Sequence, residues 1–199
     1  MITLYFNRFS RATRVRWMLE ALGVPYDMVR VDMAKGEHKA PSYLEIHPLG
    51  KLPAIVVDGK PMIESLAIVQ FLAAKFPEKG LGPTAENASD YYSWMVYAQV
   101  TLEPEVGNYF YSTNERFGRM DAAVAEKAKN ELRRLVAPVE QQLSRHDYIA
   151  GAQFTGADVV MGGVLAWAGA MGLLEGFPAI HAYIGRITAR PAFRAGRAE

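Results

Sequence analysis

The sequence predicts a small α/β domain followed by an all-helical domain. Three observations indicate this: strand and helix patterns alternate over the first 77 residues, an aperiodic stretch with two Pro and two Gly covers residues 77–87, and every later segment has helical periodicity. We therefore expect domains at residues 1–77 and 88–199. The chain of 199 residues is long enough for two such cores.

The first domain is predicted to contain a mixed sheet of four strands. Residues 2–6 are β-branched and aromatic, as in a strand, and a helix starting near Ser10 carries apolar residues at helical spacing until Gly23 ends it. The remaining elements are expected in this order: a strand at 26–33, a turn-rich segment with at most a short helix at 35–50, strands at 52–57 and 61–64 around an Asp58-Gly59 turn, and a helix at 65–76. The first two strands should be parallel, joined by a right-handed crossover.

The second domain is predicted to be helical throughout. Its first helix covers residues 88–111 and should bend at Pro104. Further amphipathic helices are expected at residues 121–145 and 178–191. Between them, Thr155 and Asp158 form a capping box that starts an apolar helix, and we interpret both as structural.

Composition and charge exclude several functions. Lys and Arg number 22 against 21 Asp and Glu, so the chain has no electrostatic basis for binding nucleic acid or an anionic membrane. It has no cysteine, which excludes disulfides, thiolate metal sites and a catalytic protein thiol. The N-terminus does not resemble a signal peptide, so a cytoplasmic location is expected. The apolar run at 159–174 is short for a bilayer span and indicates a buried helix.

Two features near the predicted hairpin need an explanation. Pro53 opens a strand although proline has no backbone N–H for a sheet ladder, so a trans proline at an edge strand is the simple reading. Glu64 and Ser65 follow the hairpin where a helix begins. Ser65 is a good N-cap, and the N–H groups of the next turn form an anion site, although an ordinary cap beside a solvated glutamate is the alternative.

Five segments of the chain form an ordered set: LYFNRFSRATRVRWMLEALGVPY, KGEHKAPSYLEIHPLGKLPAI, IESLAIVQFLAAKFP, DYIAGAQFTGADVVMG and AYIGRITARPAF. In this order and spacing they resemble the cytosolic glutathione S-transferase family, in a bacterial-type, cysteine-free form. The resemblance implies a thioredoxin-like N-terminal domain and a helical C-terminal domain. It also implies a glutathione site in which Pro53 is cis and the backbone of Leu52 pairs with the cysteinyl unit. Glu64 and Ser65 would hold the γ-glutamyl group, and His38, Lys39 and Lys51 the glycyl carboxylate.

Activation of the glutathione thiol could come from either of two hydroxyls. A thiol of pKa about 8.5 must lose about two units to be mostly ionised at neutral pH, which corresponds to roughly 2.7 kcal/mol. Ser10 lies at the start of the first helix, where serine-type members of the family carry their hydroxyl. Tyr5 aligns with the tyrosine of another type, and the Asn7 amide is a third donor. We favour Ser10, with Tyr5 next.

The resemblance implies a homodimeric transferase that uses glutathione as co-substrate and conjugates it to a small hydrophobic electrophile, without a metal. A glutathione-dependent isomerase or peroxidase, or a non-catalytic binding protein of the same fold, are the alternatives. A pocket for the electrophile is expected between the domains, and aromatic residues could line it, although such residues are more often core: Phe9, Tyr97, Tyr109, Phe110 and Tyr111.

Overall fold

The computed structural model of the chain describes residues 1–117 and 120–198. These residues form two compact units. The first unit comprises residues 1–82 together with the C-terminal segment from Thr188, and the second runs from Pro83 to Ile187. An α/β unit and a helical unit are thus both present, as the sequence predicts.

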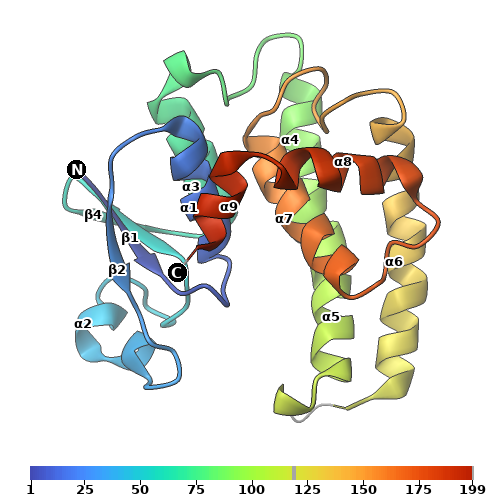
Figure 1. Cartoon of the computed structure of the whole chain (residues 1–199). Coiled ribbons are helices and arrows are strands. Elements are labelled where there is room, and N and C mark those ends of the chain that lie inside the picture. Colours follow the sequence, from blue (N-terminus) through green and yellow to red (C-terminus); the bar gives the residue numbers. More distant parts are fainter. Residues whose placement is uncertain (118–119, 199) are drawn as a thin grey trace. The chain divides into compact units, whose positions relative to one another are not determined.

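The first unit is built on a mixed four-stranded sheet (Figure 1). The strand order is β2-β1-β3-β4, with bounds Ile2–Phe6 for β1, Asp27–Arg30 for β2, Ala54–Val57 for β3 and Lys60–Ile63 for β4. Strand β1 is parallel to β2 and antiparallel to β3, and β3 is antiparallel to β4. The predicted parallel pair and the predicted hairpin are therefore both confirmed, and Asp58 and Gly59 make the hairpin turn with positive φ angles.

The residues of β1 alternate between a buried and a half-buried face of the sheet. Ile2, Leu4 and Phe6 point into a core that includes apolar residues of α1 and α3, while Thr3 and Tyr5 face the other way. The helices of the unit are α1 at Ala12–Leu22, α2 at Pro41–Leu44, α3 at Ser65–Lys75 and α9 at Pro191–Arg197, with short 3-10 turns at Glu37–Lys39 and Pro77–Lys79. Gly23 ends α1 in the left-handed conformation, as predicted.

The C-terminal helix α9 packs on α1 (Figure 1). The ring of Trp17 meets that of Phe193 edge-on at 4.9 Å between centroids. A Cβ at Gly196 would come within 2.8 Å of the Trp17 backbone, so only glycine allows this approach. The sequence places residues 88–199 in the helical domain, whereas these contacts group the last helix with the first unit. Helical periodicity shows an apolar face but not which partner covers it.

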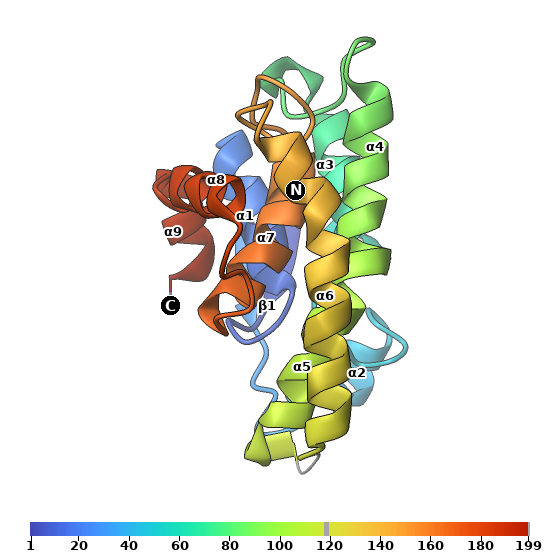
Figure 2. The ribbon, with the colours of Figure 1, turned by 90° about the vertical axis from the view of Figure 1, so that its right-hand side faces the viewer.

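The second unit consists of helices, several of which run side by side (Figure 2). Their bounds are α4 at Ala88–Val96, α5 at Glu103–Thr113, α6 at Ala122–Leu143, α7 at Gly156–Ala170 and α8 at Pro178–Thr188, with a 3-10 turn at Glu115–Phe117. A π-helical segment, Tyr97–Leu102, joins α4 to α5. The irregularity predicted at Pro104 thus lies before this residue, because proline removes the bond to the carbonyl four residues earlier.

The predicted capping box at the start of α7 is confirmed. The Thr155 hydroxyl accepts a hydrogen bond from the Ala157 N–H, and the Asp158 carboxylate accepts one from the Thr155 N–H. Helix α7 is mostly buried, as expected for its apolar sequence. None of the helices in the described part of the chain combines the length and apolar character needed to cross a bilayer.

One buried hydroxyl in this unit yields a stability prediction. Tyr91 of α4 is 1% exposed, and within the described residues its hydroxyl has no hydrogen-bond partner. A buried polar group without a partner costs about 1 to 3 kcal/mol, so Tyr91→Phe should raise the free energy of unfolding by about 1 kcal/mol. Urea denaturation measures this.

Tyr183→Phe is the matched control for that substitution. Tyr183 is equally buried, but its hydroxyl donates to the Asp158 carboxylate at 2.9 Å. Its loss should therefore destabilise the protein. If Tyr91→Phe also destabilised it, the Tyr91 hydroxyl would have a partner in solution.

Candidate functional site

The predicted ligand-binding segments meet at one end of the sheet. Ala54 at the start of β3 pairs with Tyr5 of β1 on one side and with Ile63 of β4 on the other. Leu52-Pro53 directly precedes this row and Glu64-Ser65 directly follows it. The loop after β1, which carries Ser10, leaves from the same end. Residues distant in sequence are thus brought together by the strand register.

Pro53 introduces the third strand through a cis peptide bond with Leu52. The strand itself begins at Ala54, so the backbone of Leu52 lies outside the ladder that joins β3 to β1 and β4. The cis bond expected from the family resemblance is therefore present.

The basic residues predicted to meet a carboxylate come from a loop that folds back on itself. A Cβ at Gly50 (φ 56°) would lie 2.3 Å from the backbone oxygen of His38, so the two segments touch. The Lys39 ammonium donates to the Leu49 carbonyl at 2.9 Å. These contacts place His38 and Lys39 beside Lys51, which is exposed. The loop therefore gathers positive charge next to the Leu52-Pro53 bond.

Glu64 and Ser65 occupy the strand-to-helix junction in a different way from that predicted. Glu64, not Ser65, holds the N-cap position of α3, with φ 70° and ψ 107°, and Ser65 is the first helical residue. The Ser65 hydroxyl is buried and accepts a hydrogen bond from the Arg14 guanidinium at 3.1 Å. Ser65 is thus the first residue of α3 and not its cap, and its hydroxyl is engaged by Arg14.

Arg14 is a site residue that the sequence reasoning missed. It is 6% exposed and projects from α1 to the start of α3, which puts a positive charge beside the Glu64-Ser65 junction. Its position four residues before the buried Met18 places it on the inner face of α1. The sequence does contain a signal for this position: Arg14 is a charged residue that recurs at helical spacing with the buried apolar residues of α1.

His47 is a second missed residue. It is 3% exposed, and its Nδ1 accepts a hydrogen bond from the Leu49 N–H at 3.3 Å. Burial lowers the pKa of His47, and the nearby Glu64 carboxylate opposes this effect. A neutral imidazole thus shapes the bend that leads to Gly50. Its proximity to Glu64 links the loop electrostatically to the start of α3.

The candidate thiol-activating groups have different environments. The Ser10 hydroxyl donates to the Asn7 carbonyl at 2.7 Å and accepts from the Ala12 N–H at 3.2 Å, just before α1. The Asn7 amide nitrogen donates to the Val31 carbonyl, and its oxygen accepts from the Phe9 N–H. Tyr5 is half-buried on the sheet face away from the α1 core, with its ring against that of Tyr43. Ser10 is therefore the hydroxyl at a helix start.

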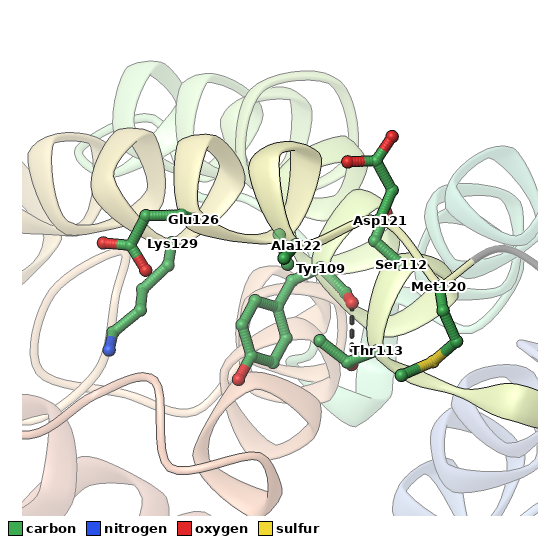
Figure 3. A pocket seen from close by; sticks show the side chains of 9 residues that line it. Tyr109, Ser112, Thr113, Met120, Asp121, Ala122, Glu126 and Lys129 are labelled. Atoms are coloured by element: carbon green, nitrogen blue, oxygen red, sulfur yellow. Dashed lines mark hydrogen bonds between the residues drawn. The ribbon is translucent and has the colours of Figure 1, made fainter.

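A hollow of about 430 Å³ lies in the second unit, between the end of α5 and the beginning of α6 (Figure 3). Tyr109, one of the aromatic residues considered above, lines it together with Thr113, whose hydroxyl donates to the Tyr109 carbonyl. The Asp121 carboxylate at its edge caps α6 by accepting from Ala123 and Val124. The Thr113 hydroxyl and the Asp121 carboxylate thus serve local structure, as does the Tyr97 hydroxyl, which donates to the Leu135 carbonyl.

Metal binding has no candidate site within residues 1–117 and 120–198. No group of three or more His, Cys, Asp or Glu side chains there is arranged to hold an ion.

Comparisons with known proteins match the chain along nearly its whole length. The family model described as "Glutathione S-transferase, N-terminal domain" matches residues 1–74, and "Glutathione S-transferase, C-terminal domain" matches residues 97–191. Glutathione S-transferase 3 of Zea mays is 31% identical over 190 residues, covering 91% of this chain and 86% of the relative. Glutathione S-transferase GST-4.5 of Xanthomonas campestris is 31% identical over 172 residues, covering 83% and 82%.

Solved structures agree with these matches. Apo glutathione S-transferase III superposes with a TM-score of 0.86 at 29% identity, covering 98% of this chain and 94% of that one. The transferase URE2P6 of Phanerochaete chrysosporium, solved in complex with oxidised glutathione, gives a TM-score of 0.85 at 27% identity with coverage of 98% and 94%. Sequence, strand-end geometry and comparisons agree: the chain belongs to the glutathione S-transferase family.

Proposed function

We propose that this protein is a glutathione transferase that binds glutathione on its first unit and conjugates it to small hydrophobic electrophiles. One observation carries the proposal: the backbone of Leu52, the Glu64-Ser65 junction and a cluster of basic side chains converge at one end of the sheet. A tripeptide with a backbone and charged groups at both ends requires these three kinds of partner.

Each part of glutathione has a proposed partner. The cysteinyl unit pairs with the Leu52 backbone beyond Pro53, and the γ-glutamyl carboxylate binds at the start of α3, at Ser65. The Glu64 carboxylate takes the γ-glutamyl ammonium, with Arg14 held behind Ser65. The glycyl carboxylate meets the basic loop of His38, Lys39 and Lys51.

The proposed reaction begins with loss of the thiol proton to solvent. The Ser10 hydroxyl then donates a hydrogen bond to the thiolate, in place of its bond to the Asn7 carbonyl. The sulfur attacks the electrophilic carbon, a C–S bond forms, and the leaving group departs with the bonding electrons. The positive end of α1 favours the anionic sulfur throughout. With no cysteine in the chain, the protein cannot form a mixed disulfide with glutathione.

The protein is further proposed to act as a cytoplasmic homodimer. Three exposed apolar side chains, Tyr92, Val96 and Val100, recur every four residues on α4 and the π-helical segment. Exposed apolar residues in such a row are typical of a surface covered by a partner. The mass measured by analytical ultracentrifugation tests the dimer.

The proposed activity is tested by glutathione binding and turnover. We expect retention on a glutathione matrix, a dissociation constant at or below the millimolar range by calorimetry, and conjugation of an aryl halide. Absence of binding at millimolar glutathione would overturn the proposal. The protein could instead bind glutathione and turn over an organic hydroperoxide or isomerise a double bond, with no turnover of any conjugation substrate. That result would replace the proposed conjugation by a peroxidase or isomerase activity.

A further inference from the structure

Tyr43 of α2 makes a short, partly buried hydrogen bond to the loop that precedes Pro53. Its side chain is 5% exposed, and its hydroxyl donates to the carbonyl oxygen of Lys51 at 2.6 Å. Lys51 is one of the residues in the proposed glutathione site.

This hydrogen bond also fixes the backbone N–H of Leu52. The Lys51 carbonyl and the Leu52 N–H belong to one planar peptide group, and that peptide bond is trans, since the cis bond of this loop follows Leu52. In a trans peptide the C=O and N–H point in opposite directions. Holding the oxygen toward Tyr43 therefore turns the Leu52 N–H away from it. A hydrogen bond to the carbonyl also polarises the N–H and makes it a stronger donor.

Tyr43 is itself held firmly. Its ring packs against that of Tyr5 with centroids 5.5 Å apart, and Tyr5 is anchored in β1 opposite Ala54. Burial raises the pKa of the Tyr43 phenol, and the nearby Tyr5 adds to this effect, so the hydroxyl remains a donor across the neutral range. Tyr5 of β1 thus packs on Tyr43, and Tyr43 in turn holds the Lys51-Leu52 peptide next to Pro53.

We propose that Tyr43 is a positioning residue for glutathione: its hydroxyl holds the Lys51 carbonyl and so directs the Leu52 N–H at the cysteinyl carbonyl of the bound tripeptide. The inference rests on the proposed function, since it assigns a role within that binding site. In this role Tyr43 acts through the orientation of one peptide group.

Tyr43→Phe tests this role because it removes the hydroxyl and keeps the ring. We expect the dissociation constant for S-methylglutathione, measured by calorimetry, to rise about fivefold, the effect of one hydrogen bond. The KM for glutathione should rise by a similar factor, while kcat and the KM for the electrophile stay within about twofold. An unchanged dissociation constant would overturn the proposal.

Tyr26→Phe is the matched control. Tyr26 lies in the same unit, and its hydroxyl also makes a short side-chain hydrogen bond, to the Glu20 carboxylate at 2.6 Å. Both variants should lose similar thermal stability, but only Tyr43→Phe should weaken binding. Equal weakening in both would mean a general effect of stability and would count against the proposal.

A modified ligand separates orientation from structure. The probe is S-methylglutathione with its cysteinyl carbonyl reduced to a methylene, which leaves the Leu52 N–H without an acceptor. The wild type should bind the probe less tightly than the parent, whereas Tyr43→Phe should discriminate about fivefold less between the two. If the wild type and Tyr43→Phe discriminated equally between the two ligands, the role proposed for Tyr43 would be overturned, and the proposed function would stand. Failure of the wild type to bind the parent would overturn the proposed function as well.

Discussion

Replacing Ser10 with alanine is expected to lower kcat/KM for conjugation by one to two orders of magnitude. The bound thiol must shift its pKa by about two units, worth about 2.7 kcal/mol, and a hydroxyl at a helix start supplies much of this. Without it the pKa of the bound thiol rises, so the acidic limb of the pH profile of kcat/KM should move to higher pH by about one to two units. Activity should recover in alkaline buffer, and the ultraviolet absorbance of the bound thiolate should shift in parallel.

Two variants isolate the chemistry from the local structure. Thr13 donates its hydroxyl proton to the Ser10 carbonyl at 3.1 Å, so Thr13→Ala loosens the same turn without touching the Ser10 hydroxyl. We expect that variant to keep its pH profile. Tyr5→Phe should retain activity within about twofold, because the Tyr5 ring packs on Tyr43. A large loss in Tyr5→Phe with an active Ser10→Ala would make Tyr5 the activating group instead.

The fold could be predicted because its signals are local. Alternation in residues 2–6, the positive-φ glycine after α1 and the capping box at Thr155 each depend on a few neighbouring residues. Such patterns report the conformation of a segment directly. The bounds of a strand also depend on its partners, and β3 begins two residues after the predicted start because the Leu52-Pro53 bond lies outside the ladder.

The buried polar contacts of the site could not be predicted because they join distant segments. Arg14 reaches Ser65 across 51 residues, and Ser65, expected as a cap, is the first residue of α3. Tyr43 meets Lys51 only because the loop between them folds back through His47 and Gly50. Periodicity shows that a side chain is buried but not which group satisfies it.

Replacing Asp158 with alanine is expected to destabilise the protein more than any other substitution considered. The carboxylate is fully buried and accepts hydrogen bonds from the Ile149 N–H, the Thr155 N–H and hydroxyl, and the Tyr183 hydroxyl, at 2.8 to 3.3 Å. Its loss leaves several buried donors without an acceptor, so the free energy of unfolding should fall by about 3 to 5 kcal/mol at neutral pH.

Thr155→Ala is the control: it removes only the cap of α7 and should lower the free energy of unfolding by about 1 kcal/mol. Urea denaturation measures both, and a loss near 1 kcal/mol in Asp158→Ala would show that water replaces the carboxylate.

The stabilising effect of Asp158 should also depend on pH. Burial raises the pKa of this carboxyl from 3.8 to about 6, although the hydrogen bonds it accepts oppose the shift. The folded state therefore binds the proton more tightly than the unfolded chain, and the Asp158 contribution is greatest below about pH 4 and declines as the pH rises toward 6. Other carboxyls titrate in the same range, so the comparison is between the wild type and Asp158→Asn, which cannot ionise. The difference in unfolding free energy between the two should shrink by about 2 kcal/mol from pH 4.5 to pH 7. A difference that grows over this range would mean that the hydrogen bonds from Ile149, Thr155 and Tyr183 outweigh burial and hold the carboxyl ionised.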